Sequence, residues 1–228
     1  MDGVRANPHI DLRSCRLGLR PSLAIVPTMP TNKTTHITAL SGSPSARSRS
    51  TALLQLALTR LESDEAHQQA VHVRELPPAA LLFADTQAPQ IRAAVAAIEA
   101  ADLVIVATPI YKAAYSGLLK TFLDLLPQDA LRGKTVLPLA TGGSAAHLLA
   151  LDYTLKPVLI ALGARHILDG VFATDAQLQP HETSGGYVPD AALLQRLDRA
   201  LQGLDEAPAP RCRPAASVVP QIGAALMR

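Results

Sequence analysis

Apolar runs alternate with segments of helical periodicity along the middle of the chain. Five segments are predicted to be strands: residues 37–40, the region around Val71 and Val73, and residues 103–107, 135–140 and 165–172. The first and third are continuous apolar runs of the kind found in parallel sheets. Five segments with apolar residues at helical spacing are predicted to be helices: residues 50–61, 90–100, 116–126, 147–162 and 190–204. Residues 174–189 show neither pattern and are predicted to form a long loop.

Capping residues and prolines refine these expectations. Ser48 or Ser50 is expected to cap the first helix, because a serine hydroxyl can accept a hydrogen bond from a free backbone N–H. Pro157 is expected to kink the fourth helix, since proline lacks the N–H that a helix interior requires. Pro138 is unusual for a central strand for the same reason.

The alternation of strands and helices predicts an α/β fold with a doubly wound parallel sheet. Five strands in about 170 residues favour the strand order 2-1-3-4-5, with right-handed crossovers and helices on both faces. In this order the winding reverses between strands one and three, and ligands bind beyond the carboxyl ends of the strands at that point. Three loops should meet there: residues 41–50, 108–115 and 141–147.

Composition bounds the domain organisation. A chain of 228 residues that is 48% hydrophobic and 18% charged can bury one core, which we place in a single domain over residues 36–204. Residues 1–35 are expected to form an irregular extension, in which Met29 offers an alternative start, and residues 205–228 a flexible tail.

Charge and cysteine content exclude several function classes. A net charge of +2 is too small for a dedicated nucleic-acid or anionic-membrane binder. Cys15 and Cys212 lie near opposite ends, so neither a disulfide framework nor a cysteine metal site is indicated, and a reducing cytoplasm is expected. The longest apolar stretches fall short of the roughly 18–20 residues that cross a bilayer.

The first loop has the composition of an anion site. Hydroxyl side chains and two arginines, Arg47 and Arg49, lie between a strand and a helix N-terminus, where free N–H groups and the helix dipole favour a phosphate. The patterns of triphosphate and dinucleotide loops are absent, so a monophosphate suits the loop better. An ordinary serine-rich capped turn would have the same sequence.

The second and third loops suit a flat ring. The chain has only four Tyr and three Phe, yet Tyr111 and Tyr115 fall in the second loop, beside Pro109, where they could stack on a heterocycle. Gly142 and Gly143 would let backbone amides approach the polar edge of a ring. Packing at a helix start, or at a subunit contact, explains Tyr115 equally well, and a plain glycine turn explains the third loop.

Three segments resemble the NADPH-dependent FMN reductases of alkanesulfonate assimilation, and the resemblance covers roughly residues 36–204. They are ALSGSP at 39–44, ATPIYKAAYSGLLKT at 107–121 and LPLATGGSAAHLL at 137–149. The YKAAYSG run is specific to that branch, whereas GSP and TGG occur widely among flavodoxin-like reductases. The resemblance implies a flavodoxin-like three-layer sandwich, with FMN and NADPH as cofactors.

The resemblance also implies a set of cofactor-binding residues. The phosphate of FMN would lie on Ser41, Ser43, Ser48 and Ser50; the ring against Thr108, Pro109, Ile110 and Tyr111; and the ring edge at Thr141, Gly142, Gly143 and Ser144. Relatives usually place arginine after Gly-Ser-Pro, where this chain has Ser45, so Arg47 or Arg49 would supply the cation. A tyrosine matching Tyr115 is associated in the family with a π-bulge at a tetramer contact.

Hydride transfer between two cofactors needs no protein acid, base or nucleophile, so no catalytic side chain is expected. The resemblance implies that reduced FMN leaves for a flavin-dependent monooxygenase that cleaves sulfonates. One alternative is a quinone or azo reductase of the same fold that retains FMN. Another is a flavodoxin-like electron carrier or binding module. This alternative is disfavoured because the chain has no Trp and because residues 36–204 are nearly balanced in charge, with 13 basic and 15 acidic residues. No metal site is expected, because the histidines show no ligand spacing.

The predicted third helix has more apolar faces than packing on one sheet requires. It carries Leu118, Leu119, Phe122, Leu123, Leu125 and Leu126. We therefore expect a homo-oligomer, a dimer or tetramer, that associates through the predicted third and fourth helices.

Overall fold

A computed structural model describes residues 35–63, 66–181 and 186–204. Apart from Thr35, the predicted N-terminal extension lies outside these residues, as does the whole predicted tail at 205–228. The elements, in chain order, are β1 (Thr35–Ser41), α1 (Arg49–Arg60), β2 (Ala66–His72), η1 (Val73–Glu75), α2 (Pro78–Leu82), α3 (Pro89–Ala100), β3 (Leu103–Tyr111), β4 (Ala114–Tyr115), α4 (Gly117–Leu123), β5 (Thr135–Gly142), η2 (Ala145–His147), η3 (Leu151–Leu155), α5 (Lys156–Ala161), β6 (His166–Ile167), β7 (Val171–Thr174), β8 (Leu178–Pro180), β9 (Tyr187–Pro189) and α6 (Ala191–Gln202).

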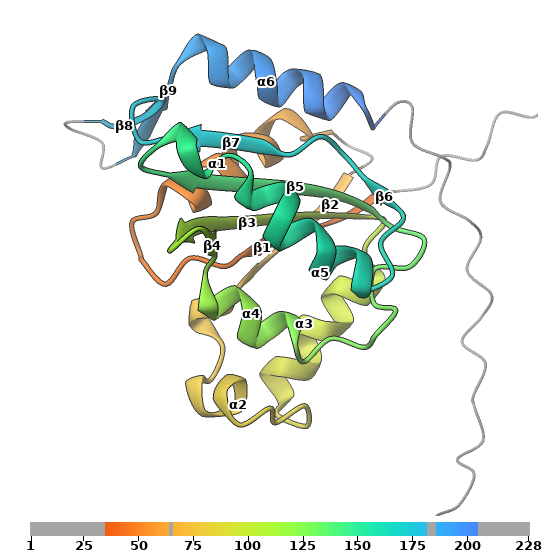
Figure 1. The fold of residues 1–228 in the computed structure, drawn as a ribbon. Helices are drawn as coiled ribbons and strands as arrows, with labels where there is room; N and C mark the ends of the chain where they lie inside the picture. Colours follow the sequence, from red (N-terminus) through yellow and green to blue (C-terminus); the bar gives the residue numbers. More distant parts are fainter. Residues whose placement is uncertain (1–34, 64–65, 182–185, 205–228) are drawn as a thin grey trace, which may run out of the picture. The chain divides into compact units, whose positions relative to one another are not determined.

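The main sheet has the predicted winding (Figure 1). Its strand order is β2-β1-β3-β5-β6, with β7 also paired to β5, and all of these pairs are parallel. Because β6 and β7 together occupy the place of the fifth strand, this is the order 2-1-3-4-5. The flavodoxin-like α/β fold is therefore confirmed.

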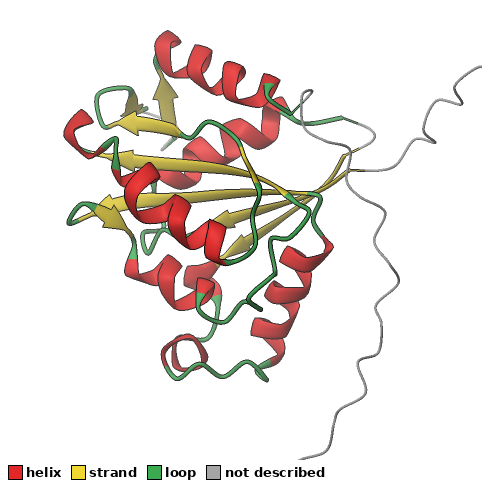
Figure 2. Ribbon diagram, turned by 45° about the vertical axis from the view of Figure 1, so that its right-hand side comes forward, coloured by secondary structure: helices red, strands yellow, loops and turns green. Residues whose placement is uncertain are grey.

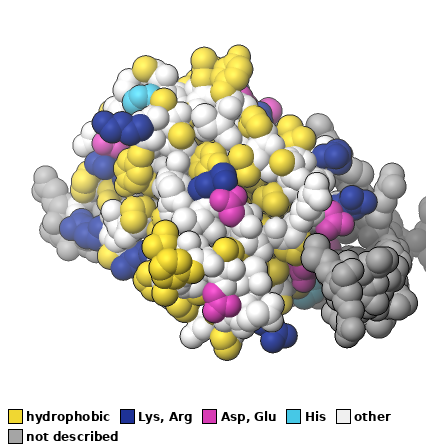
Figure 3. Space-filling view, turned by 60° about the horizontal axis from the view of Figure 1, so that its bottom comes forward, with side chains coloured by type: hydrophobic (Ala, Val, Ile, Leu, Met, Phe, Trp, Pro, Cys, Tyr) yellow, Lys and Arg dark blue, Asp and Glu magenta, His cyan; other side chains and the backbone are white. Residues whose placement is uncertain are grey.

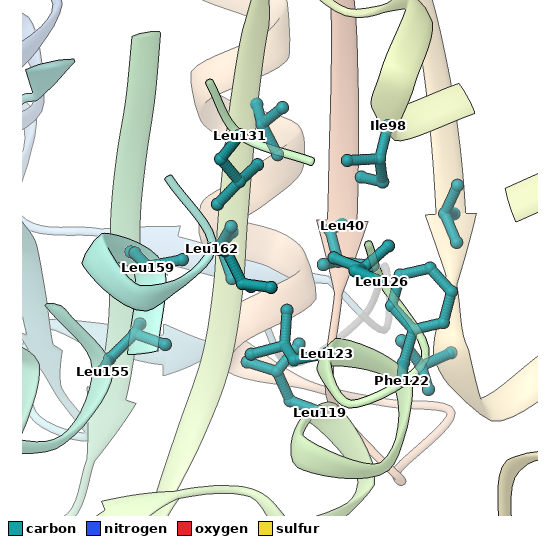
Figure 4. Packing of buried hydrophobic residues seen from close by; sticks show 14 of the residues in the cluster. Leu40, Ile98, Leu119, Phe122, Leu123, Leu126, Leu131, Leu155, Leu159 and Leu162 are labelled. Carbon is teal, nitrogen blue, oxygen red and sulfur yellow. The ribbon is translucent and has the colours of Figure 1, made fainter. Parts of the chain in front are cut away.

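Helices cover both faces of the sheet (Figure 2). One face is closed by α3, α4 and the segment of η3 and α5, whose side chains pack with Leu40 of β1 in the cluster of Figure 4. The other face is closed by α1 and α6 through Leu53, Leu54, Leu193 and Leu197, all fully buried. This three-layer packing leaves the strand ends, rather than the faces, open to ligands. No helix among the described residues is long and apolar enough to span a bilayer.

The fifth predicted strand is divided into β6 and β7, and Pro138 in the neighbouring strand β5 explains the position of the break. β5 pairs with β6 at Thr135 and Val136 and with β7 from Leu139 onward, so no partner strand residue pairs with Pro138 on this side. A proline cannot donate to a sheet ladder, and the chain detours past it. At the detour Gly170 packs on Pro138, and a Cβ at Gly170 would lie 3.4 Å from the proline Cγ.

The predicted helix over 147–162 is also divided rather than kinked. A 3₁₀ turn, η2, is followed by the π-helix η3 and then by the short α-helix α5, which has Pro157 in its first turn. The N–H of Lys156 donates to the carbonyl of Leu151, five residues back, which is the π-helical spacing. The π turn thus ends where Pro157, without an N–H, begins a new helix.

Four short elements were not expected: α2, β4, β8 and β9. Residues 174–189, predicted to be a loop, contain the antiparallel strands β8 and β9, which form a separate two-stranded sheet. Pro78 begins the one-turn helix α2 instead of only ending a strand. Ala114 and Tyr115 form β4 just before the predicted third helix, which begins as expected with Ser116 as the N-cap of α4 but ends three residues early, at Leu123. Each is too short to leave a periodic pattern.

Candidate functional site

The three predicted loops meet in one cleft at the carboxyl ends of β1, β3 and β5. The cleft has a volume of about 220 Å³. From the predicted set it is lined by Ser43, Arg47, Ser48, Arg49, Pro109, Ile110, Tyr111, Thr141, Gly142 and Gly143. Ser45, Asp175 and Tyr187 complete the lining.

The first loop is fastened to the neighbouring elements by its backbone. The N–H of Gly42 donates to the carbonyl of Ala107 at 2.8 Å, and the Ser116 hydroxyl donates to the carbonyl of Gly42 at 2.5 Å. A Cβ at Gly42 would lie 2.6 Å from the Cβ of Leu119, closer than real Cβ contacts come. Only glycine therefore lets this loop lie against α4.

Serine hydroxyls organise the turn into α1. Ser48 is the N-cap, as expected, and its hydroxyl accepts from the N–H of Thr51. The buried Ser43 hydroxyl accepts from the N–H of Ser45 at 3.2 Å. The first turn of α1 contains no acidic residue, so the helix dipole faces the cleft without a competing carboxylate in that turn.

The two arginines of the first loop differ in their surroundings. Arg47 is exposed, lines the cleft, and has no hydrogen bond or ion pair within the described ranges of the chain. Arg49 is engaged: its Nε donates to the carbonyl of Leu178 at 3.0 Å and its guanidinium lies 3.4 Å from Asp175. Arg47 is therefore the cation available to an anion in the cleft.

The second loop is a tight hairpin. β3 continues to Tyr111 and turns back as β4, with Ile110 paired to Tyr115 and Tyr111 to Ala114. The two turn residues, Lys112 and Ala113, have φ values of 51° and 62°, which two-residue hairpin turns require and non-glycine residues seldom adopt. The turn leaves the Tyr111 ring about half exposed, at 49%, on the cleft.

The third loop brings backbone to the cleft. A Cβ at Gly142 would lie 3.0 Å from the ring of Phe172, so this glycine is needed for the close packing of β5 on β7. At Gly143 the nearest atom to such a Cβ is a carboxylate oxygen of Asp175 at 3.9 Å, which is an ordinary contact. The missing side chain at Gly143 therefore leaves the backbone amides of the third loop open to the cleft, and it is not required to avoid a steric clash.

Four residues of the predicted set do not line the cleft. Ser41 hydrogen-bonds to the hydroxyl of Thr51, and Ser50 to that of Ser48. The Thr108 hydroxyl accepts from the N–H of Ser116, and Ser144 caps η2. Their hydroxyls hold the loops in shape.

Tyr115 lies in β4 and not in a helix, so no π-bulge stands at this position in the structure, and its place at a subunit contact stays a prediction. The π-helix η3 lies at Leu151–Leu155 and is in contact with β4. Tyr115 belongs to the hairpin instead, because its backbone pairs with Ile110.

Sequence reasoning missed Asp175 and Tyr187. Both follow β7 in the segment predicted to be a loop, and Tyr187 reaches the cleft because β9 folds back on β8. No local pattern marked them, although Tyr187 is one of only four tyrosines in the chain.

Comparison with known proteins identifies the family. The family profile of NADPH-dependent FMN reductases matches residues 35–179. The chain belongs to this family. Its fold, its enzyme class as an NAD(P)H:FMN oxidoreductase and its cofactors FMN and NADPH are thereby confirmed.

Individual FMN reductases are similar over most of their length. The chain is 48% identical over 167 residues to an FMN reductase (NADPH) of Escherichia coli (strain K12), covering 73% of this chain and 86% of that protein. It is 44% identical over 180 residues to an FMN reductase (NADPH) of Pseudomonas putida (strain KT2440), covering 79% and 91%. The crystal structure of apo NADH:FMN oxidoreductase (EMOB) is similar with a TM-score of 0.68 at 43% identity, covering 78% of this chain and 94% of that one.

The residues of the cleft fit FMN. The first loop offers hydroxyls, backbone N–H groups at a helix N-terminus and the free Arg47, a donor set for a phosphate. Tyr111, Pro109 and Ile110 form a wall for a planar ring, and the open backbone at Gly143 can meet polar ring atoms. When bound, FMN supplies the hydride acceptor.

Proposed function

We propose that this FMN reductase supplies reduced FMN to a flavin-dependent monooxygenase that cleaves alkanesulfonates. The observation that carries the proposal is the open cleft at the switch point, where a phosphate loop and an aromatic wall meet. Its volume of about 220 Å³ is below the ~300–1,000 Å³ typical of small-molecule pockets, so a bound flavin stays partly exposed. Such a site suits a flavin that enters oxidised and leaves reduced.

The chain's own residues bind and orient, and they do no acid–base chemistry. Ser43, Ser48 and the amides of the first loop hold the phosphate, with Arg47 as its cation. Tyr111 and Pro109 orient the ring, and Gly142 and Gly143 bring amides to its edge. Together these contacts place the flavin where NADPH can approach its exposed side.

Flavin content separates this proposal from the FMN-retaining quinone or azo reductase. We expect the purified protein to carry less than stoichiometric FMN and to oxidise NADPH rapidly only when FMN is added. Protein that purifies bright yellow and reduces quinones without added flavin supports the retaining enzyme instead. No NADPH oxidation at saturating FMN contradicts both.

Coupling to a monooxygenase is tested in a two-enzyme assay. The reductase, NADPH, catalytic FMN and an alkanesulfonate monooxygenase should release sulfite from octanesulfonate at a rate set by the reductase concentration. The same assay with Arg47→Gln should lose sulfite release in parallel with NADPH oxidation. Unchanged sulfite release after omission of the reductase would contradict the proposed delivery of reduced FMN.

We further propose that the enzyme is a cytoplasmic homo-oligomer, a dimer or tetramer. The apolar residues named on the predicted third helix are buried within the chain, apart from the partly buried Leu118, so the expectation of spare apolar faces there is wrong. Of the two predicted helices, the fourth carries the exposed large apolar side chains: Leu148, Leu149, Tyr153 and Ile160. Their exposed fractions are 50% or more, and burying them against a second copy removes apolar surface from water. Figure 3 shows hydrophobic side chains gathered in patches on one face of the molecule.

A further inference from the structure

Arg49 joins the first loop to the hairpin formed by β8 and β9. From the first residue of α1, its Nε donates to the carbonyl of Leu178 in β8 at 3.0 Å. Its guanidinium lies 3.4 Å from Asp175 and 5.5 Å from the centroid of the Tyr187 ring in β9. One side chain thus contacts three points in the segment that follows β7.

This arrangement uses the charge of Arg49 within the protein. The planar guanidinium can pair with a carboxylate, donate to a carbonyl and stack on an aromatic ring at once, which a lysine ammonium cannot do. Side-chain exposures of 30% for Arg49 and 49% for Asp175 place the ion pair at the rim of the cleft. Arg49 is therefore a poor candidate for the cation that binds phosphate, and a good candidate for a residue that holds the β8–β9 hairpin in place.

The hairpin needs such a support on its cleft side. β8 and β9 pair with each other and with no strand of the main sheet in the described ranges. The base of the hairpin is held by the burial of Leu178 and by two hydrogen bonds of Gln177. The backbone carbonyl of Gln177 accepts from the N–H of Asp190, and its side-chain oxygen accepts from the guanidinium of Arg196. On the cleft side, Arg49 lies over the Tyr187 ring and bonds to the carbonyl of Leu178, and Tyr187 also packs against the buried cluster that contains Leu178.

We propose that Tyr187 is a second aromatic wall of the flavin site, and that Arg49, with Asp175, is the positioning residue that holds it there. Tyr187 and Tyr111 line the same cleft from two different hairpins. The contact made by Tyr187 is with the part of the flavin that FMN and riboflavin share, not with the phosphate. This inference deepens the proposed flavin site and rests on it.

The test measures dissociation constants for FMN and riboflavin by quenching of flavin fluorescence. Tyr187→Ala should weaken both flavins by the same factor, about 5- to 10-fold, because an aromatic contact is lost. Tyr187→Phe, the matched control, should stay within about twofold of the wild type, since it keeps the ring. A Tyr187→Ala variant that binds both flavins normally overturns the proposed wall.

The positioning role is tested by removing Arg49 and Asp175 together. Arg49→Gln with Asp175→Asn leaves the net charge of the cleft unchanged, and it should weaken FMN and riboflavin by the same factor as Tyr187→Ala. Adding Tyr187→Ala to this pair should cause little further loss, because the two changes remove one contact. A loss confined to FMN, or a fully additive further loss, overturns the role of Arg49 as a support.

Two measurements keep the outcome interpretable. Arg49→Lys retains the charge opposite Asp175 but not the planar fork, so it should weaken both flavins equally and by less than the double variant. Wild-type protein measured alongside separates the two proposals: if it does not bind FMN, the flavin site itself fails. If it binds FMN while every variant matches it, the Tyr187 proposal alone fails.

Discussion

At the scale of single residues, Gly42 sets the position of the first loop. Gly42→Ala should lower the free energy of unfolding by about 1–3 kcal/mol, because the new methyl group meets the Cβ of Leu119 at 2.6 Å. Gly117→Ala is the matched control, since a Cβ there has nothing within 4 Å, and it should leave stability unchanged or slightly higher. Urea denaturation of the two variants measures the difference, and equal stabilities would contradict the argument.

Arg47 is expected to select FMN over riboflavin. Arg47→Gln should raise the KM for FMN by roughly 10- to 100-fold, because a charge-assisted hydrogen bond to the phosphate is worth about 1.5–3 kcal/mol. The KM for riboflavin, which has no phosphate, should stay within about twofold. Steady-state NADPH oxidation with each flavin gives both values, and an equal rise for the two would remove Arg47 from the phosphate site.

Tyr115 is expected to make stability depend on pH at the alkaline end. Burial raises the pKa of its phenol above the ordinary value, although nearby Lys120 lowers it in part. The folded protein then holds this proton more tightly than the unfolded chain, so the stabilisation is present below about pH 10 and is lost as the pH rises through the raised pKa. The pKa of Lys120, raised by its hydrogen bond to Asp124, acts in the same direction.

Tyr115→Phe should therefore flatten the fall in unfolding free energy between pH 9 and 11 relative to the wild type. Urea denaturation across that range measures it, with Tyr111→Phe, at a half-exposed tyrosine, as the control. Lys120 is present in all three proteins, so the difference measures the Tyr115 phenol together with its charge interaction with Lys120. Identical slopes for Tyr115→Phe and wild type would show that burial of this phenol does not affect the pH dependence of the unfolding free energy.

At the scale of elements, Ser116 joins α4 to the first loop. Its buried hydroxyl accepts from the N–H of Leu119 at 3.0 Å and donates to the carbonyl of Gly42, so it is both a helix cap and a tie between two walls of the site. Ser116→Ala should lower the free energy of unfolding by about 1–3 kcal/mol and raise the KM for FMN as the loop loosens. A stability loss without any change in KM would show that the loop keeps its place without this tie.

At the scale of the whole molecule, the exposed apolar segment is expected to be buried in an oligomer. Light scattering at about 10 µM should show a dimer or tetramer, and Tyr153→Asp with Ile160→Asp should yield monomers, because two charges cannot enter an apolar interface unpaired. Val188→Asp, at an exposed valine on β9, should leave the oligomer intact. A monomeric wild type would contradict the predicted self-association.

Most of the sheet could be predicted because its central strands are continuous apolar runs. The segment 103–107 lies wholly within β3, between β1 and β5, and its side chains are buried on both faces because helices cover both sides of the sheet. The convergence of Ser43, Tyr111 and Gly142 was predictable too, since the strand order alone brings the ends of β1, β3 and β5 to one edge. The choice between Arg47 and Arg49 was not, because it depends on Asp175 and Leu178, more than 120 residues away.

The amino-acid sequence by itself determined the layers, the order of the strands and the loops that form the cleft, because periodicity and apolar runs are local properties of the chain. Only the tertiary structure decided which hydroxyls line the cleft and which hold the loops: Ser43 and Ser48 line it, whereas Ser41 and Ser50 bond to other hydroxyls and do not. It also placed Tyr187 and Asp175 in the site and located a π-helix at Leu151–Leu155. These features arise from contacts between distant segments, and such contacts leave no period in the sequence.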